Sequence, residues 1–450
     1  MPEDRVNTRL FSWSLTAALA GFIFGFDTVV ISGAEQTIQA LWGLGAGMHG
    51  IAMASALYGT VLGSLVGSWP TDRFGRRATL LWIGILYFVS AVGSALAPDV
   101  YTFLVARFIG GVGIGISTVA APFYIAEIAP AEYRGRLAGM FQFNIVFGIL
   151  IAFLSNAMLG GIGEHAWRWM LGVEAIPALL YTVLCLTLPE SPRWLIAGKG
   201  DRAAGIAVLG LIRPGSTSDE LHERANAIAA ASSDRITAGR FWTRRLQVPI
   251  LLAFFIAFFN QLSGINAILY FAPRIFELTG LAAQAALLQS VGIGITNLIF
   301  TFLGLWLIDR VGRRTLLYVG SAGYIASLGL VAWAFFTQNF AVVPPAIFGF
   351  IAAHAIGQGA VIWVFIAEIF PDRHRANGQA LGSFTHWLFA ALLTTFFPRM
   401  VTAFQPGQVF LFFCGMMVLQ LVWVMLLVPE TKGVPLEEMQ KRLGLDEPPV

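Results

Sequence analysis

The chain of 450 residues has few charges and few cysteines: 12% of its residues are charged and two are cysteines. Soluble domains carry about a quarter charged residues, so this composition excludes an ordinary water-soluble fold. Two cysteines, Cys185 and Cys414, are too few to predict a disulfide framework or a cysteine metal centre. Nucleotide-binding loops, metal-ligand clusters and nucleophilic triads are also missing from the sequence. We therefore expect no enzyme, no cofactor and no metal site.

Hydrophobic residues are abundant instead, at 57% of the chain, and the mean hydropathy is +0.73. A helix needs about 20 apolar residues to cross a bilayer. Because the first apolar stretch is long, carries Asp27 and lacks a cleavage-like end, it is not a cleaved signal peptide. The sequence predicts an all-α membrane protein whose surroundings are the lipid bilayer. Twelve stretches have the required length: 10–33, 50–71, 78–97, 101–124, 137–158, 167–188, 247–270, 282–308, 315–337, 343–367, 379–403 and 405–428.

Three short motifs occur twice, in the same order. Asp-Arg-x-Gly-Arg-Arg occupies 72–77 and 309–314, Ala-Glu-Ile-x-Pro occupies 126–130 and 367–371, and Pro-Glu-Ser/Thr occupies 189–191 and 429–431. The nearly constant spacing indicates a tandem duplication. We predict an N-terminal six-helix half (1–188), a C-terminal six-helix half (247–430) and a tail (431–450). The polar linker at 189–246 contains two predicted amphipathic helices, at 201–211 and 219–231.

The basic residues predict the orientation in the membrane. Of 28 Lys and Arg residues, 24 lie outside the spans on the side of the N-terminus. By the positive-inside rule, both termini are expected in the cytoplasm, in a multi-pass plasma (inner) membrane protein. The net charge of +3 then reflects topology and indicates no nucleic-acid partner.

The repeated charges lie where helices meet the cytoplasm. Acidic and basic groups at such positions can form a charged latch that holds neighbouring helix ends together in one state and breaks in another. The alternative is that they only anchor loops at the interface. The predicted latch residues are Asp72, Arg73, Arg76, Arg77, Glu127, Arg134 and Glu190, with Asp309, Arg310, Arg313, Arg314, Glu368, Arg375 and Glu430 in the second half.

Asp27 lies in the middle of the first span, and an ionisable residue at that depth indicates function. Arg107, in the fourth span, is its expected partner. The glycines that follow Arg107 at 110–115 should allow close helix packing. A carboxylate whose partner moves between conformations can gain and lose a proton. The alternative is a static ion pair that only holds two helices together.

Beside the two Asp-Arg-x-Gly-Arg-Arg loops, the chain contains Pro-Glu-Ser-Pro-Arg-Trp-Leu at 189–195, Gln-Leu-Ser-Gly-Ile-Asn at 261–266 and Pro-Glu-Thr-Lys-Gly at 429–433. In these motifs it resembles the sugar porter branch of the major facilitator superfamily over almost its whole length. The resemblance implies import of a monosaccharide by alternating access, with two halves moving around a site near the bilayer midplane. In proton-coupled members the first-helix acid accepts the proton, which assigns that role to Asp27, paired with Arg107.

This resemblance implies that the energy source is a proton gradient and that the partners are a sugar and protons. One chain holds a complete pathway, so a monomer suffices. The alternatives are a facilitative, uncoupled uniporter of sugar or polyol, and a sensor that does not transport.

The resemblance also indicates the sugar-binding residues. Amide side chains suit sugar hydroxyls because they both donate and accept hydrogen bonds, and an indole offers an apolar face to the ring. Each polar residue could alternatively serve only as an interhelical hydrogen-bonding group. Asn260 replaces a glutamine, and His386 replaces an amide of most relatives. The predicted substrate residues are Gln142, Asn260, Gln261, Asn266, Asn297, Trp363, His386 and Phe24, with Tyr270 as an outer gate.

Overall fold

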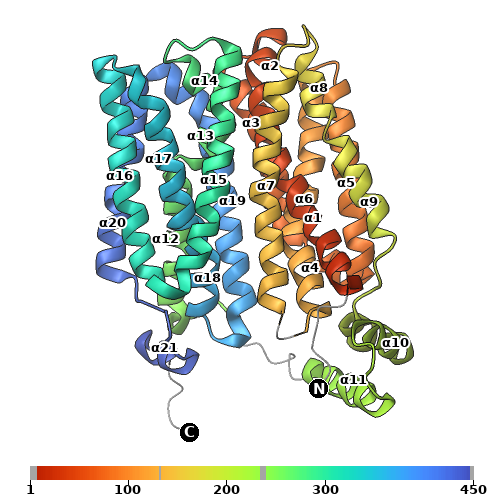
Figure 1. The fold of residues 1–450 in the computed structure, drawn as a ribbon. Coiled ribbons are helices and arrows are strands. Elements are labelled where there is room, and N and C mark those ends of the chain that lie inside the picture. The colour runs from red at the N-terminus through yellow and green to blue at the C-terminus, as the bar shows by residue number, and fades with distance from the viewer. Residues whose placement is uncertain (1–7, 131–132, 234–239, 446–450) are drawn as a thin grey trace. The chain divides into compact units, whose positions relative to one another are not determined.

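The computed structural model describes residues 8–130, 133–233 and 240–445, and all regular elements within them are helices. Within these residues, twelve stretches are long and apolar enough to cross a membrane, as predicted (Figure 1). The predicted ends move by several residues; the stretch at 50–71, for example, is one span ending at Val66 and a separate short helix. The spans are Thr8–Gly33, Ala46–Val66, Arg76–Leu96, Val100–Ile128, Gly139–Leu159, Ala166–Cys185, Arg244–Tyr270, Ala283–Val311, Arg313–Thr337, Phe340–Ile369, Arg373–Ala403 and Pro406–Leu427.

The contacts divide the chain into two compact units. Unit 1 contains the described parts of 1–27, 59–149 and 171–238, and unit 2 contains those of 28–58, 150–170 and 239–450. Segments 28–58 and 150–170 therefore pack with the later part of the chain, although they precede the linker in sequence. Packing and chain order differ here, so the predicted domain bounds at 188, 246 and 430 stay a prediction.

Unit 1 depends on glycine for the close approach of its helices. A Cβ added at Gly115 would lie 2.4 Å from the carbonyl oxygen of Thr60, so the backbones can meet only without a side chain there. The predicted packing role of the glycine series is confirmed at this position. The helices with most of their length in this unit are α1 (Thr8–Val30), α4 (Ser68–Phe74), α5 (Arg76–Leu96), α6 (Val100–Ile128), α7 (Arg134–Leu159) and α9 (Ala175–Cys185); α3 (Ala46–Val66) and α8 (Ala166–Gly172) also cross the border.

The linker forms the two predicted helices, α10 (Arg202–Ile212) and α11 (Ser218–Ser233), after a short π-helical turn η2 (Trp194–Gly198). Asp201 caps α10 by accepting a hydrogen bond from the Ala204 backbone N–H (3.1 Å). Ile196, Leu209 and Ala225 form a small buried core between these segments. The apolar faces of the two amphipathic linker helices therefore pack against each other and against η2.

Unit 2 contains two interrupted spans. Gly264, with φ +89°, ends α12 before α13, and a Cβ there would lie 2.8 Å from the Phe413 ring. Gly357 separates α17 from α18, where a Cβ would lie 2.7 Å from the Gly320 Cα. Breaks of this kind free backbone N–H and C=O groups, which are tolerated at membrane depth only where they are buried in protein or line a cavity. The helices are η1 (Ile31–Gly33), α2 (Glu35–Leu41), η4 (Arg244–Leu246), α12 (Gln247–Leu262), α13 (Ile265–Tyr270), α14 (Ala272–Glu277), α15 (Ala283–Val311), α16 (Arg313–Thr337), η5 (Phe340–Val342), α17 (Val343–Ile356), α18 (Gln358–Ile369), α19 (Asp372–Ala403), α20 (Pro406–Leu427) and α21 (Leu436–Arg442).

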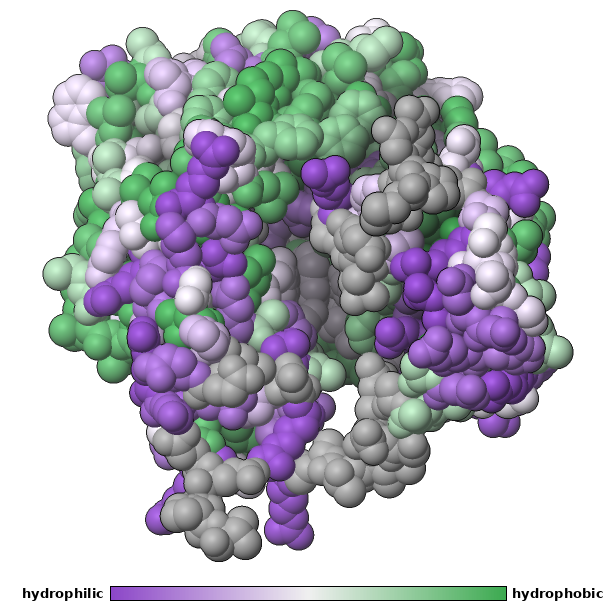
Figure 2. All heavy atoms as spheres, turned by 60° about the horizontal axis from the view of Figure 1, so that its bottom comes forward, coloured by the Kyte–Doolittle hydropathy of each residue, from purple (hydrophilic) through white to green (hydrophobic). Residues whose placement is uncertain are grey.

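The surface separates by polarity. Figure 2 brings the bottom of the view of Figure 1 forward and shows many hydrophilic residues on that face, with hydrophobic residues gathered toward its rim. In each unit we call the helix ends that carry the repeated charged motif the motif end: the loop at 72–77 in unit 1 and the loop at 309–314 in unit 2. An apolar flank with polar ends is what a bilayer requires of a spanning protein.

Candidate functional site

A buried ion pair lies inside unit 1, as predicted from the sequence. Arg107 on α6 donates a hydrogen bond from one terminal nitrogen to Asp27 Oδ1 on α1. Its other terminal nitrogen donates to the backbone oxygen of Asp27 (3.2 Å). Both residues are 1% exposed. Because an isolated charge at this depth would be very costly, each group depends on the other.

Glu174 is a third charged group beside this pair, and the sequence analysis did not select it. It precedes α9, is 2% exposed, and interacts with both Asp27 and Arg107. An acid within the predicted span 167–188 was a signal that could have identified it. We refer to Asp27, Arg107 and Glu174 as the buried triad.

The buried triad holds two carboxyl groups and one guanidinium. If both acids were ionised, one negative charge would lack a cation of its own, which burial disfavours. The Asp27 Oδ2 atom accepts no hydrogen bond from the described residues. A proton held by either acid would balance the charge and could bridge the two carboxyl groups. The arrangement is therefore suited to binding one exchangeable proton.

Unit 2 contains a chain of amide side chains in place of charges. Asn266 Nδ2 donates to Gln261 Oε1 (2.6 Å), and Gln261 Nε2 donates to Asn260 Oδ1 (2.9 Å). Asn260 Nδ2 then donates to Gln358 Oε1 (3.5 Å). All four residues are at most 6% exposed. We call these four residues the amide chain; its bonds run in one direction and reinforce one another.

The amide chain ends at Gln358, which was not predicted as a site residue. Its Nε2 atom has no hydrogen-bond partner among the described residues, although the side chain is fully buried. The short side chain of Asn260 and the helix break at Gly357 together bring Gln358 to the chain. The end of the amide chain therefore presents a buried N–H donor.

Aromatic residues adjoin the amide chain. His386 on α19 lies 3.1 Å from Gln261 Nε2, and the Trp363 ring lies 5.4 Å from the His386 ring. Trp387 packs edge-on against His386. The structure thus brings together five of the predicted substrate residues: Asn260, Gln261, Asn266, Trp363 and His386. A polar cluster lined by an indole is suited to a ligand with hydroxyl groups on an apolar ring.

The remaining predicted site residues are Asn297, Tyr270, Gln142 and Phe24. Asn297 on α15 accepts a hydrogen bond from Thr301 within its own helix (3.4 Å). Tyr270, at the end of α13, is fully buried. Gln142 and Phe24 belong to unit 1, on α7 and α1. For these four residues a role in binding or gating stays a prediction.

The first charged cluster at the motif end has the predicted composition. Arg76 binds Glu127 through two hydrogen bonds, of 2.8 and 2.9 Å, and reaches Asp72 at 3.1 Å. Glu190 accepts the backbone N–H of Arg76 (2.9 Å) at the start of α5. Burial raises the pKa of Glu190, although hydrogen bonds from nearby backbone N–H groups oppose this. A carboxylate placed here also complements the helix N-terminus.

The second charged cluster repeats this geometry. Arg313 binds Glu368 at 3.1 and 2.7 Å and Asp309 at 2.9 Å, while Glu430 accepts the Arg313 backbone N–H (2.9 Å). A Cβ at Gly312, with φ +106°, would lie 2.6 Å from Glu430. The sequence therefore needs glycine in this turn for two reasons, the backbone angle and the approach of the carboxylate.

Other predicted latch residues bind elsewhere. Arg77 and Arg314 donate to the carbonyls of Leu186 and Met425, both at 2.8 Å. Arg310 stacks over Trp306 at 4.0 Å. The remaining positions are these: Arg73 is exposed, Arg375 donates to the Ala367 carbonyl, and the side chain of Arg134 lies outside the described residues.

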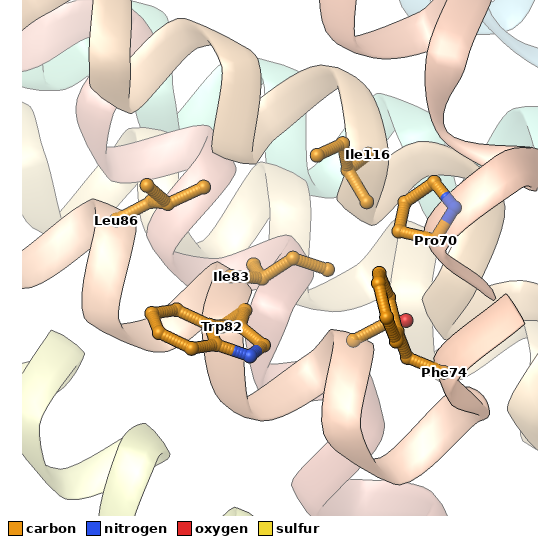
Figure 3. Close-up of a pocket in the computed structure, with 7 residues that line it drawn as sticks. Pro70, Phe74, Trp82, Ile83, Leu86 and Ile116 are labelled. Atoms are coloured by element: carbon orange, nitrogen blue, oxygen red, sulfur yellow. The ribbon is translucent and has the colours of Figure 1, made fainter.

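A cavity of about 420 Å³ in unit 1 has different chemistry (Figure 3). Its lining is almost entirely apolar, with Phe74, Trp82 and Ile116 among the side chains that face it. The Thr79 hydroxyl already donates to the Gly75 carbonyl (2.7 Å). Because this cavity offers few hydrogen-bonding groups, we do not assign it to a polar ligand. Among the described residues, no group of three or more His, Cys, Asp or Glu side chains could hold a metal ion.

Twelve spans, repeated charged clusters and interior polar sites together define a membrane transporter rather than an enzyme. The family model described as "Sugar (and other) transporter" matches residues 13–443, and the chain belongs to this family. It is 34% identical to the D-xylose-proton symporter of Escherichia coli K12, over 96% of each chain. It is 32% identical to the arabinose-proton symporter of Bacillus subtilis, over 95% of this chain and 94% of the relative. The inward open structure of the E. coli xylose transporter matches with a TM-score of 0.85 and 32% identity, over 96% of this chain and 99% of that chain.

Proposed function

We propose that the protein imports a monosaccharide together with a proton, by alternating access across the plasma membrane. Asp27 is the proton acceptor, Arg107 is its partner, and Glu174 is the neighbouring acid that allows one proton to be shared. The observation that carries this proposal is the buried triad, in which two carboxyl groups face one guanidinium. Because the charge balances only with a proton bound, movement of Arg107 would change the proton affinity of the site.

The amide chain supplies the sugar-binding surface of unit 2. Sugar hydroxyls can accept from the free N–H of Gln358 and exchange hydrogen bonds with Gln261, while the indole of Trp363 faces the apolar side of the ring. Similarity to the xylose and arabinose symporters makes pentoses the first substrates to test, followed by hexoses. Neutral amides suit release as well as binding, because they place no net charge on the sugar.

The positive-inside rule places the motif ends in the cytoplasm, with both termini. There the two charged clusters act as a latch that stabilises one arrangement of the helix ends and loosens during the cycle. The proton gradient supplies the energy, no cofactor takes part, and a monomer carries out transport.

A facilitative uniporter of sugar or polyol is the second candidate. It is favoured by the two hydrogen bonds between Arg107 and Asp27, since a fully buried pair can be a fixed structural link between α1 and α6. In that case the triad would hold its proton throughout the cycle, and uptake would follow the sugar gradient alone.

Uptake into proteoliposomes separates the two candidates. Labelled xylose and glucose are supplied with and without an inward proton gradient to the wild type and to Asp27→Asn. We expect the wild type to accumulate sugar above equilibrium only with the gradient, and Asp27→Asn to exchange sugar without accumulating it. Asp99→Asn is the matched control, because Asp99 is an exposed helix cap outside the spans and Asn also caps well. Equilibrating uptake in every condition would support the uniporter.

A further inference from the structure

A second buried ion pair lies in unit 2, apart from the sites described above. Glu35, the first residue of α2, is fully buried. Arg274 on α14 binds both of its carboxylate oxygens, each at 2.8 Å. His49 Nε2 on α3 lies 2.8 Å from Glu35 Oε2. Two parallel hydrogen bonds to a carboxylate are the strongest geometry available to an arginine.

Further contacts complete this group, which we call the Glu35 cluster: Glu35, Gln39, His49 and Arg274. Arg274 donates to Gln39 Oε1 (2.6 Å), one turn along α2. The His49 ring packs edge-on against Phe271, with centroids 6.1 Å apart. The charges of Glu35 and Arg274 cancel, and His49 Nε2 lies at hydrogen-bond distance from the carboxylate. The ion pair at the centre of the cluster therefore carries no net charge.

The Glu35 cluster joins parts of the chain that lie far apart in sequence. Glu35 and His49 precede the first repeated motif, whereas Arg274 lies ten residues after the span break at Gly264. Helix α14 continues directly from α13, which carries Asn266 of the amide chain and the predicted gate Tyr270. The position of α13 is therefore coupled to the ion pair through one short connection at Phe271.

We propose that Glu35 and Arg274 are positioning residues of the transport cycle. They hold α13 and α14 against α2 and α3 while the end opposite the motif end is closed, and their separation opens that end to sugar. This inference rests on the proposed alternating access, in which each end must open in turn. A buried pair that forms in one state and is lost in the other shifts the population toward the closed state.

Distances between spin labels at Thr37→Cys and Ala282→Cys test this inference. Both sites are exposed, one on α2 and one next to α15, and the native cysteines are buried. In the full-length transporter without sugar or proton gradient, we expect Glu35→Gln to increase the ratio of long to short distances roughly tenfold, within the usual range of such couplings. Arg274→Gln is expected to give the same shift.

The matched control is Glu277→Gln, which makes the same change as Glu35→Gln and lies on the same helix as Arg274. The Glu277 side chain has no hydrogen bond among the described residues. This control should leave the distances unchanged. The double variant Glu35→Gln/Arg274→Gln removes both charges, so it should shift the distances no further than either single variant. It also keeps the test valid if one single variant fails to fold.

Transport provides a second readout that simple destabilisation would not produce. A larger population open to the outside raises apparent affinity, so KM for external sugar should fall while the maximal rate falls too. Unchanged distances in both Glu35→Gln and Arg274→Gln, or an equal shift in Glu277→Gln, would overturn the inference. The proposal of proton-coupled transport would not be affected by that result. Conversely, loss of coupling in the uptake assay would not alter the distance measurement.

Discussion

The two charged clusters at the motif ends can be compared contact by contact. Arg76 meets Glu127 at 2.8 and 2.9 Å, and Arg313 meets Glu368 at 3.1 and 2.7 Å. Even the hydroxyl next to each capping glutamate repeats. Ser191 donates to Glu127 at 2.5 Å, and Thr431 donates to Glu368 at 2.6 Å.

The interiors of the two units share no such likeness. The buried triad of unit 1 has charged groups, whereas the amide chain of unit 2 has neutral ones. Phe348 stands 241 residues after Arg107, at the spacing of the Ala-Glu-Ile motifs, so an aromatic ring replaces the cation. The duplication therefore kept the helix-end clusters while the interiors diverged, one with charged groups and one with neutral amides.

The largest effect should come from removing the cation of the buried triad. Arg107→Gln leaves two buried carboxyl groups without their guanidinium, and breaking a buried ion pair costs about 3–5 kcal/mol. We expect a much lower thermal unfolding midpoint of the purified protein and no proton-driven uptake.

Adding Asp27→Asn to Arg107→Gln should recover most of the stability, because one buried acid is then neutral. If Arg107→Gln were as stable as the wild type, the buried triad would have to be solvated. The contrast between a charged interior in unit 1 and a neutral one in unit 2 would then be weaker.

Truncation of the amide chain should affect binding and leave coupling intact. Gln261→Ala removes the partner of Asn266 Nδ2 and of Asn260 Oδ1, and each buried unpaired polar group costs about 1–3 kcal/mol. KM for sugar should therefore rise roughly 5- to 150-fold, while the number of protons carried per sugar stays the same. Both are measured by initial rates of sugar and proton uptake.

Gln420→Ala provides the matched control for this variant. Gln420 is a buried glutamine of unit 2 that donates to Ser321 (3.0 Å), outside the amide chain. Its KM should stay near that of the wild type. A changed proton-to-sugar ratio in Gln261→Ala would show that the two interiors do not act separately.

The sequence was sufficient for the helices and the repeat, because hydrophobic length and repeated motifs are local signals. It also pointed to the residues of the two charged clusters, whereas their role as a latch stays a prediction. Asp27 and Arg107 could be paired because ionisable residues are rare at bilayer depth. Glu174 could have been found by the same rule.

Other contacts depend on the fold and had no sequence signal. Glu35 is buried only because Arg274, 239 residues later, neutralises it. Gln358 enters the amide chain only because α17 and α18 separate at Gly357. Glu190 was predicted as part of a latch, but its role as the cap of α5 required the structure.

The smallest effect is expected from the charged clusters, and it tests whether their equal geometry means equal energy. Arg76 and Arg313 have side chains 9% and 10% exposed, with the same set of partners. Hydrogen bonds to charged groups contribute about 1.5–3 kcal/mol, so Arg76→Gln and Arg313→Gln should each lower the unfolding free energy by a similar amount. Because the clusters belong to different units, the double variant should be additive within about 0.5 kcal/mol. Denaturant titration of all four proteins measures this. If one of the two single variants lost clearly more unfolding free energy than the other, the two clusters would differ in energy despite their equal geometry.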